Sequence, residues 1–375
     1  MTVVVIVFWV AAALLVYTQV GYALLLALLA RFQPARPAPA WEGELPGISV
    51  VVAAYNEQSV ISQRIANLRS LDYPPERVQV IVASDGSTDG TASRARAAGA
   101  DLVLELARGG KIRAQDAAVA QAAGELLVFS DANAVWERDA LKRLVAAFGD
   151  AHVGYVCGDV TFTDDGGTNQ EGLYWRYEMW LRRMESALSS VTSGNGAIYA
   201  TRRESYLQVH PLAGHDLSFP FNMVKRGWRA VYVTDARATE KMAPSIEGEF
   251  ARKRRMARRT WPTVFTSGLL SPRGYSPLYA LMIFSHRILR YLVPFLHVLA
   301  LAANIALIGQ GWVYLVTLAL QLALFLGAAL APLAPARLLL VARYYVVTNW
   351  ALAAGLWDWL RGERSPVWET VEGTR

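Results

Sequence analysis

Residues 48–57 read ISVVVAAYNE, an apolar run that ends in three polar side chains, and residues 78–91, VQVIVASDGSTDGT, repeat the pattern. Continuous runs of β-branched residues are typical of strands buried on both faces of a sheet. Amphipathic stretches follow both runs, and the alternation predicts helices at 59–71, 89–98, 110–123 and 137–148 and further strands at 101–106 and 126–130. This order predicts an α/β fold with a parallel sheet covered by helices on both faces.

Polar clusters follow three of the predicted strands. Residues 55–57 follow the first strand, residues 85–89 follow the second, and Asp131 and Asn133 follow the fourth. Each cluster taken alone also fits a turn or a helix cap, because Asp, Ser, Thr and Gly are common in both. Three acidic clusters at successive strand ends favour a shared site, since ligands bind beyond the carboxyl ends of parallel strands.

The first strand is followed by neither a P-loop nor a G-x-G-x-x-G motif. The sequence therefore supports neither a Walker nucleotide site nor a dinucleotide site. Carboxylates stand where such loops carry glycines. Asp and Glu can hold a nucleobase and ribose by hydrogen bonds, or a divalent cation that neutralises a diphosphate.

These residues resemble the family-two glycosyltransferases, which have the Rossmann-like GT-A fold of nucleotide-diphospho-sugar transferases. The matching segments follow the family order: AAYNE at 53–57, SDGSTDGT at 84–91, GK at 110–111, GE at 124–125, FSDAN at 129–133, SGNGA at 193–197, HD at 215–216 and GWR at 227–229. The likeness is strongest to membrane-bound members that act on exopolysaccharide or lipid-linked saccharides, partly because of SHRILR at 285–290.

The resemblance implies roles for the residues of a donor site. Tyr55, Glu57 and Asp85 would contact the nucleoside, and Lys111 would lie near the ribose or diphosphate. Asp131 would bind Mg²⁺ or Mn²⁺ and the diphosphate. The donor sugar would lie against Gly194, Asn195 and Gly196, and Asp216 would be the general base of an inverting transfer. The donor would be a UDP- or GDP-type sugar.

Two departures from the family pattern change these expectations. Asn133 stands where the family usually has a second acid, so metal binding is expected to be weaker or to draw on His215. Processive members carry Gln-x-x-Arg-Trp, whereas this chain has RRTW at 258–261, without the glutamine. Addition of a single sugar is therefore favoured over processive synthesis.

Charge and cysteine content exclude other classes of protein. The net charge of +6 equals the contribution of the cationic run at 252–259, so a general nucleic-acid-binding surface is excluded. That run either attracts anionic lipid or places Arg255, Arg258 and Arg259 over the diphosphate. Cys157 is the only cysteine, which excludes an intramolecular disulfide.

Hydropathy divides the 375 residues into a polar block between apolar segments. Residues 1–31 predict a transmembrane helix rather than a cleaved signal peptide, since no basic segment precedes it. Arg31 and Arg36 follow, which places the block in the cytosol by the positive-inside rule. The remaining expectations are a GT-A catalytic domain at 44–262, an interfacial helix at 274–290, a transmembrane hairpin at 291–335, a third transmembrane or interfacial helix at 338–360 and a tail at 361–375.

The expected function is that of a glycosyltransferase of a bacterial inner membrane. It would move one hexosyl or N-acetylhexosaminyl unit to a lipid-linked or polysaccharide acceptor, in exopolysaccharide or glycolipid synthesis. The alternatives are a processive polysaccharide synthase and a non-catalytic GT-A subunit of a membrane assembly.

Overall fold

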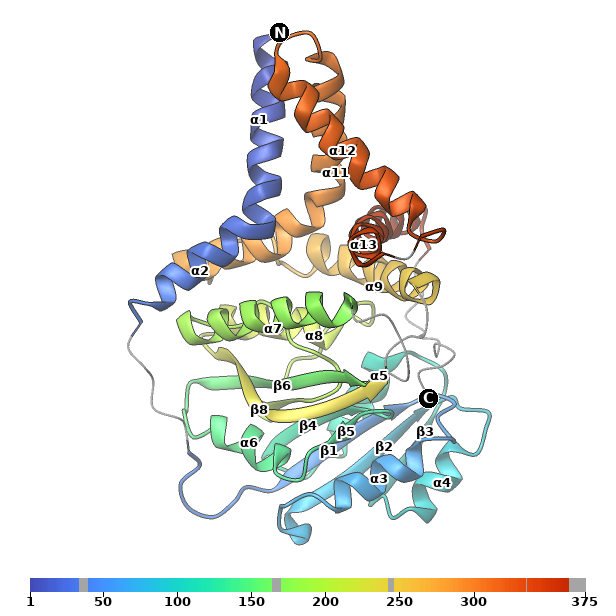
Figure 1. Ribbon diagram of the computed structural model, residues 1–375. Coiled ribbons are helices and arrows are strands. Elements are labelled where there is room, and N and C mark those ends of the chain that lie inside the picture. Colours follow the sequence, from blue (N-terminus) through green and yellow to red (C-terminus); the bar gives the residue numbers. More distant parts are fainter. Residues whose placement is uncertain (34–39, 164–169, 242–245, 335, 364–375) are drawn as a thin grey trace.

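The computed structural model describes residues 1–33, 40–163, 170–241, 246–334 and 336–363. A sheet domain lies at one end and a group of long apolar helices rises from it at the other (Figure 1). Between these parts lie α7 (Gln170–Leu188), α8 (His215–Lys225) and α9 (Ile246–Thr266). Helices α7 and α8 pack against the sheet, and α9 packs against α8 and the last apolar helix.

The sheet has eight strands in the order β3-β2-β1-β4-β7-β6-β8-β5 within the described residues. Its first four strands in this order are parallel: β1 (Ile48–Ala54), β2 (Val78–Asp85), β3 (Leu102–Leu106) and β4 (Leu126–Asp131). The register pairs Ala54 with Ser84 and Ala53 with Asp131. The strand ends that carry the polar clusters therefore lie at one edge, and the predicted α/β fold is confirmed.

Alternate residues of the parallel strands enter two different cores. Val50 and Val52 of β1 pack with one set of helices, and Val51 and Ala53 pack with the other. The first core is covered by α3 (Ile61–Arg69), α4 (Thr91–Ala97) and α6 (Ala140–Ala147), and the second by α5 (Lys111–Ala120) and α8. Burial on both faces explains why the strands are continuous apolar runs.

The other half of the sheet is mixed. It consists of β5 (Val135–Trp136), β6 (Val153–Thr163), β7 (Tyr199–Arg202) and β8 (Arg229–Lys241). Strand β7 runs antiparallel to both β4 and β6, and β6 pairs with β8 in parallel. Because β7 is inserted beside β4, the segment just before it, 193–197, reaches the edge where the polar clusters lie.

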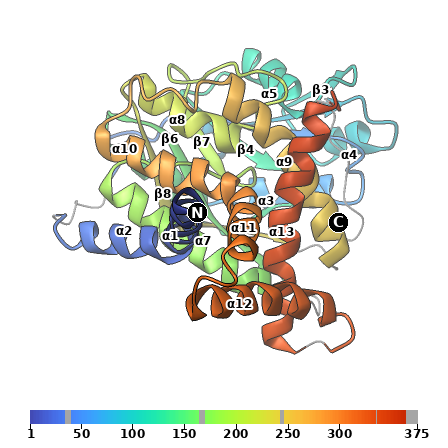
Figure 2. The same ribbon diagram turned by 90° about the horizontal axis from the view of Figure 1, so that it is seen from above.

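Four helices among the described residues are long and apolar enough to cross a membrane: Thr2–Ala30, Pro277–Ala306, Trp312–Leu330 and Arg337–Leu360. The upper parts of the first three, α1 (Thr2–Val16), α11 (Leu289–Ala306) and α12 (Trp312–Leu330), rise together away from the sheet (Figure 1). The fourth, α13 (Arg337–Leu360), lies across them and packs along α9 (Figure 2). This placement favours the interfacial interpretation of 338–360.

Two of these long helices contain a π-helical turn. The N-terminal helix changes at η1 (Tyr17–Gly21) and continues as α2 (Tyr22–Ala30), and the chain bends there (Figure 1). The segment α10 (Pro277–Met282) passes through η3 (Ile283–Ile288) directly into α11. The expected interfacial helix at 274–290 and the first half of the hairpin are thus one continuous helix, and residues 307–311 form the turn before α12.

Candidate active site

Asp85 holds the loop that leads into α5. Its carboxylate, 1% exposed at the end of β2, accepts hydrogen bonds from the amides of Gly109 at 2.7 Å and Gly110 at 3.1 Å. The guanidinium of Arg108 lies 3.3 Å from the same carboxylate and 3.0 Å from the centroid of the Tyr55 ring. Tyr55 and Asp85, two of the predicted nucleoside contacts, therefore meet at one wall through Arg108.

The SDGSTDGT segment also shapes the loop after β1. The amide of Asn56 donates to Ser87 Oγ at 3.1 Å, and the amide of Glu57 donates to Thr91 Oγ1 at 2.8 Å. Asn56 Oδ1 in turn accepts from the Thr88 amide at 2.9 Å. The hydroxyl residues of this segment thus fix the backbone that presents Tyr55 and buried Glu57.

Lys111 and Asp131 form an ion pair between the first turn of α5 and the end of β4. Gly196 lies against both: a Cβ at this position would be 3.1 Å from Asp131 Oδ2 and 3.2 Å from Lys111 Nζ. The absence of a side chain at Gly196 leaves room beside these charges. Asn133 follows Asp131 after two residues and is half-buried.

The segment 193–197 connects Asp131 with Asp216. The Gly194 amide donates to the backbone carbonyl of Asp216 at 2.6 Å. A Cβ on Gly194 would lie 1.8 Å from Tyr155 Oη, so only glycine fits there. Asn195, expected beside the donor sugar, uses its side-chain amide within the fold: Nδ2 donates to the Gly158 carbonyl at 2.7 Å and Oδ1 accepts from the Ile198 amide at 2.9 Å.

Asp216 lies in the first turn of α8. Burial and the neighbouring Arg255 lower the pKa of Arg259, whereas the charge of Asp216 acts to raise it, so Arg259 lies near the predicted base. Arg258 turns toward α13, with Nε 3.6 Å from Asp358 and Nη1 3.3 Å from Glu363. Of the three arginines predicted at the diphosphate, Arg259 is thus near Asp216 and Arg258 is engaged by α13.

His215 is a buried member of an aromatic cluster. Its ring stacks on Phe219 at 3.9 Å, and Nδ1 lies 2.8 Å from Tyr199 Oη. Gln115 donates to the same Tyr199 oxygen at 3.0 Å, and among the described residues Nε2 of His215 is buried without a hydrogen-bond partner. Burial, and secondarily Lys111, hold the pKa of His215 well below its usual range. These contacts favour a structural role over a metal-ligand role.

The predicted residues are joined by one series of contacts. Asp85 binds the Gly110 amide, the adjacent Lys111 pairs with Asp131, both lie against Gly196, and Gly194 binds Asp216. Among the residues described, no group of three or more His, Cys, Asp or Glu side chains could hold a metal. Asp131 and Asn133 offer one carboxylate and one amide, which fits a Mg²⁺-type ion completed by substrate phosphates.

Three arginines of the site region were missed by the sequence analysis. Arg108 lies between Asp85 and Tyr55, and the Nη2 atom of buried Arg182 donates to the Gly194 carbonyl at 3.0 Å. Arg64 is 1% exposed, stacks 4.4 Å from the Trp136 ring centroid and donates to the Ala134 carbonyl at 3.1 Å. Arg64 could have been suspected, because it lies on the apolar stripe of α3 beside Ile61, Ile65 and Leu68.

The sheet domain is similar to known glycosyltransferases. Residues 49–210 match the family model described as Glycosyl transferase family 2. An N-acetylglucosaminyltransferase from Rhizobium meliloti is 29% identical over 260 residues, which are 63% of this chain and 60% of the relative. A beta-monoglucosyldiacylglycerol synthase from Synechocystis sp. is 33% identical over 154 residues, 38% of this chain and 32% of the relative. The matched part of the chain thus spans less than two thirds of the length of each of these relatives.

A solved structure extends the likeness to the apolar helices. The mannosyltransferase PcManGT from Pyrobaculum calidifontis, in complex with GDP-Man and Mn²⁺, matches with a TM-score of 0.72 at 25% sequence identity. The match covers 96% of this chain and 100% of that chain. The sheet domain therefore has the GT-A-like fold of glycosyltransferase structures, and residues 49–210 within it match the family that the sequence motifs indicated.

Proposed function

We propose that the protein is an inverting glycosyltransferase that moves one sugar from a nucleotide-diphospho-sugar to an acceptor at the membrane. The supporting observation is the series of contacts that joins Asp85, Lys111, Asp131, Gly196, Gly194 and Asp216. The series ends at Asp216, a carboxylate suited to be a base, and contains the ion pair of Lys111 with Asp131, a cation beside a carboxylate. Direct displacement at an anomeric carbon needs both the base and the cation, and it inverts the configuration.

In this proposal Asp216 accepts the proton of the acceptor hydroxyl as the hydroxyl attacks. Lys111 and Arg108 stabilise the charge of the departing diphosphate, and Arg259 with Arg255 completes the cationic lining from α9. A Mg²⁺ or Mn²⁺ ion held by Asp131 and Asn133 would supply further neutralisation of that diphosphate. Tyr55 and Glu57 bind the nucleoside, and Arg108 orients the ring of Tyr55 by lying over its face.

The acceptor is proposed to be lipid-linked or a saccharide at the surface of a bacterial inner membrane, with the domain on the cytosolic side. Large apolar side chains on α1 and α12 are exposed along their lengths, among them Ile6, Leu315 and Leu320, and lipid would cover them. The synthase from Synechocystis is named for a diacylglycerol lipid, which supports an acceptor of this class. The donor is proposed to be a UDP- or GDP-sugar.

Single addition is preferred to processive synthesis. Trp261, the aromatic residue of the RRTW segment, is 2% exposed, and its indole Nε1 donates to the Leu352 carbonyl of α13 at 2.9 Å. An indole fixed in this way holds two helices together and is poorly placed to carry a growing polymer. The length of the product separates the two functions.

The first prediction concerns Asp216→Asn, assayed as purified full chain in nanodiscs with nucleotide-sugar donors. We expect kcat to fall about 10²- to 10⁴-fold, because the general base is lost while the shape is kept. Asp235→Asn, an exposed carboxylate on β8, is the matched control and should retain activity. Unchanged transfer by Asp216→Asn would reject the mechanism, and an inactive parent chain would favour the non-catalytic alternative.

A further inference from the structure

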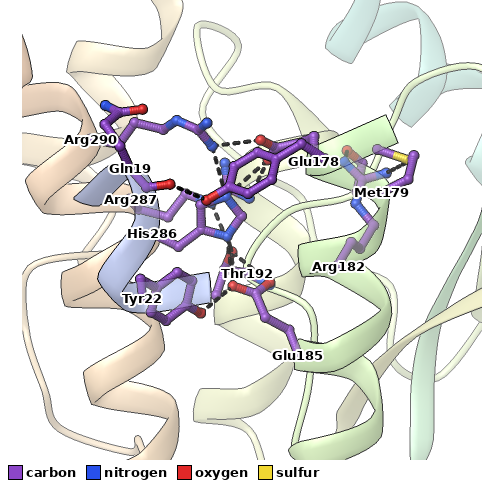
Figure 3. A network of polar contacts seen from close by, with 12 residues as sticks. Gln19, Tyr22, Glu178, Met179, Arg182, Glu185, Thr192, His286, Arg287 and Arg290 are labelled. Atoms are coloured by element: carbon purple, nitrogen blue, oxygen red, sulfur yellow. Dashed lines mark hydrogen bonds and ion pairs between the residues drawn. The ribbon is translucent and has the colours of Figure 1, made fainter. Parts of the chain in front are cut away.

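A buried cluster of charged side chains joins the glycosyltransferase domain to the apolar helices (Figure 3). Glu178 and Glu185 come from α7, Thr192 from the segment before β7, and His286, Arg287 and Arg290 from η3 and α11. Glu185 and Thr192 have no exposed surface. Charges removed from water in this way are stable only when each is paired and hydrogen-bonded, so the cluster fixes how the two parts meet.

Glu185 and Thr192 are the centre of the cluster. Oε1 of Glu185 accepts from Tyr22 Oη at 2.7 Å and from His286 Nδ1 at 2.6 Å. Oε2 accepts from the Thr192 amide at 3.1 Å and from its hydroxyl at 3.0 Å. Arg287 Nε donates to the Thr192 hydroxyl at 2.8 Å. Thr192 is therefore held from one side by α7 and from the other by the π-helical turn of a candidate membrane span.

A second set of contacts ties the same part of the chain to the spans. The carbonyl of Val191 accepts from Tyr279 Oη of α10 at 3.0 Å, and its amide donates to Ala230 of β8 at 2.8 Å. Tyr17 Oη of η1 lies 2.8 Å from Ser285 Oγ of η3, so the two π-helical turns touch one another. Such turns recur at functional sites and bends. A change in the bend of either span would therefore displace Val191 and Thr192.

Thr192 stands directly before the segment that lines the candidate site. Two residues later Gly194 binds the carbonyl of Asp216, and Gly196 lies against Asp131 and Lys111. The hydroxyl of Thr192 is thus the point at which Arg287, from a candidate membrane span, meets the segment 192–197. Transfer reactions are sensitive to such positioning, since a displacement of about 1 Å can cost about 10²-fold in rate.

We propose that Arg287 and Thr192 are positioning residues for sugar transfer, through which the docking of η3 on α7 sets the segment 192–197. The site would then be assembled correctly only while the bent membrane helix is seated on the domain. This inference rests on the proposed function for its catalytic consequence, but the positioning of the segment can be measured without any substrate.

The test uses Thr192→Val, which removes the hydroxyl and keeps the side-chain volume and the ion pairs of Glu178 with Arg290 and Glu185 with His286. Thr192→Ser restores the hydroxyl. Arg287→Lys keeps the charge and removes the Nε donor. Thr317→Val is the matched control, because Thr317 makes its polar contacts with Asn304 between α11 and α12, away from the site.

Hydrogen exchange of the full chain in nanodiscs is followed by mass spectrometry for peptides covering 190–198. We expect at least about 10-fold faster exchange in Thr192→Val and Arg287→Lys. Thr192→Ser and Thr317→Val should exchange as the parent does. In the transfer assay the first two variants should lose about 10- to 100-fold in kcat with donor KM unchanged.

Exchange of 190–198 that is unchanged in Thr192→Val and Arg287→Lys would overturn the inference, whatever the transfer rates. A rise in exchange with no loss of kcat would overturn it as well, because the contact would then be structural only. If the parent chain transfers no sugar, the proposed function is wrong, while faster exchange in the two variants would still support positioning of the segment.

Discussion

Gly194 links the candidate base to the domain core. Its amide binds Asp216, and its Cα is so close to Tyr155 Oη that a methyl group would overlap the oxygen. We predict that Gly194→Ala destabilises the protein by about 1–3 kcal/mol, the usual cost of overpacking, and that it abolishes transfer. Thermal unfolding in detergent measures the first effect. Gly47→Ala, where an added Cβ would lie 3.8 Å from Gly124 Cα, should change neither stability nor transfer.

His215 makes the stability of the domain sensitive to acid. Burial holds its pKa well below the usual range, so the folded protein keeps the ring neutral while the unfolded chain takes up a proton below about pH 6.5. Acid therefore favours unfolding. We predict a loss approaching about 1.4 kcal/mol for each pH unit below that value, until the folded pKa is reached.

The measurement is the free energy of unfolding between pH 7.5 and 5 for the parent chain and for His215→Phe. The variant should lose this part of the pH dependence. His210→Gln changes an exposed histidine and should keep the parent's slope. Equal slopes for the parent and His215→Phe would show that His215 is not buried as a neutral ring.

The helices α9 and α13 are joined at one carboxylate. Asp358, 2% exposed, accepts from Arg254 Nε at 2.7 Å and Nη2 at 2.6 Å, a bidentate pair that suits the planar guanidinium. We predict a coupling energy of about 0.5–3 kcal/mol in a double-mutant cycle of Asp358→Asn and Arg254→Gln, measured by thermal unfolding. Additive effects of the two changes would show that this pair does not hold α13 on α9.

The strands of the parallel half of the sheet could be predicted from the local hydrophobic pattern. The runs that begin at Ile48, Val78 and Leu126 became strands because their β-branched and aliphatic residues enter cores on both faces. The antiparallel insertion of β7 has no local signature, since it depends on pairing with residues of β4 and β6 that are more than 40 positions away in the chain. The π-helical turns η1 and η3 were also missed, and the residues through which they touch, Tyr17 and Ser285, are far apart in the chain.

The residues of the site could be predicted from the sequence, but several of their side-chain contacts could not. The ends of β1, β2 and β4 were expected to converge because parallel strands share an edge, and they do. The contact of Arg108 with Tyr55 and the pairing of Glu185 with His286 could not be read from the sequence. These partners are distant in the chain, and nothing in their local pattern distinguishes them from surface charges.

The arrangement of the apolar helices and the sheet domain predicts which parts of the chain lie on each side of a membrane. Cys157 is buried, so single cysteines introduced elsewhere report accessibility to an impermeant maleimide in intact cells. We predict that Gly309→Cys, in the turn between α11 and α12, reacts from outside. Arg337→Cys and Arg361→Cys, at the two ends of α13, should both react only after permeabilisation, as should Asp235→Cys in the sheet domain. Reaction of Arg337→Cys and Arg361→Cys from opposite sides would mean that α13 crosses the bilayer.

The central claim is that acids far apart in the chain surround one diphosphate beneath the apolar helices. An experimental structure of the full chain in a nanodisc, with Mn²⁺ and the nucleoside diphosphate of the preferred donor, tests it most directly. We expect the diphosphate to lie between Lys111, Asp131 and Gly196, with the nucleobase beside Tyr55. The carboxylate of Asp216 should face the acceptor side, across the donor from the phosphates. Nucleotide bound at any other surface, with Asp216 turned away from it, would contradict the account.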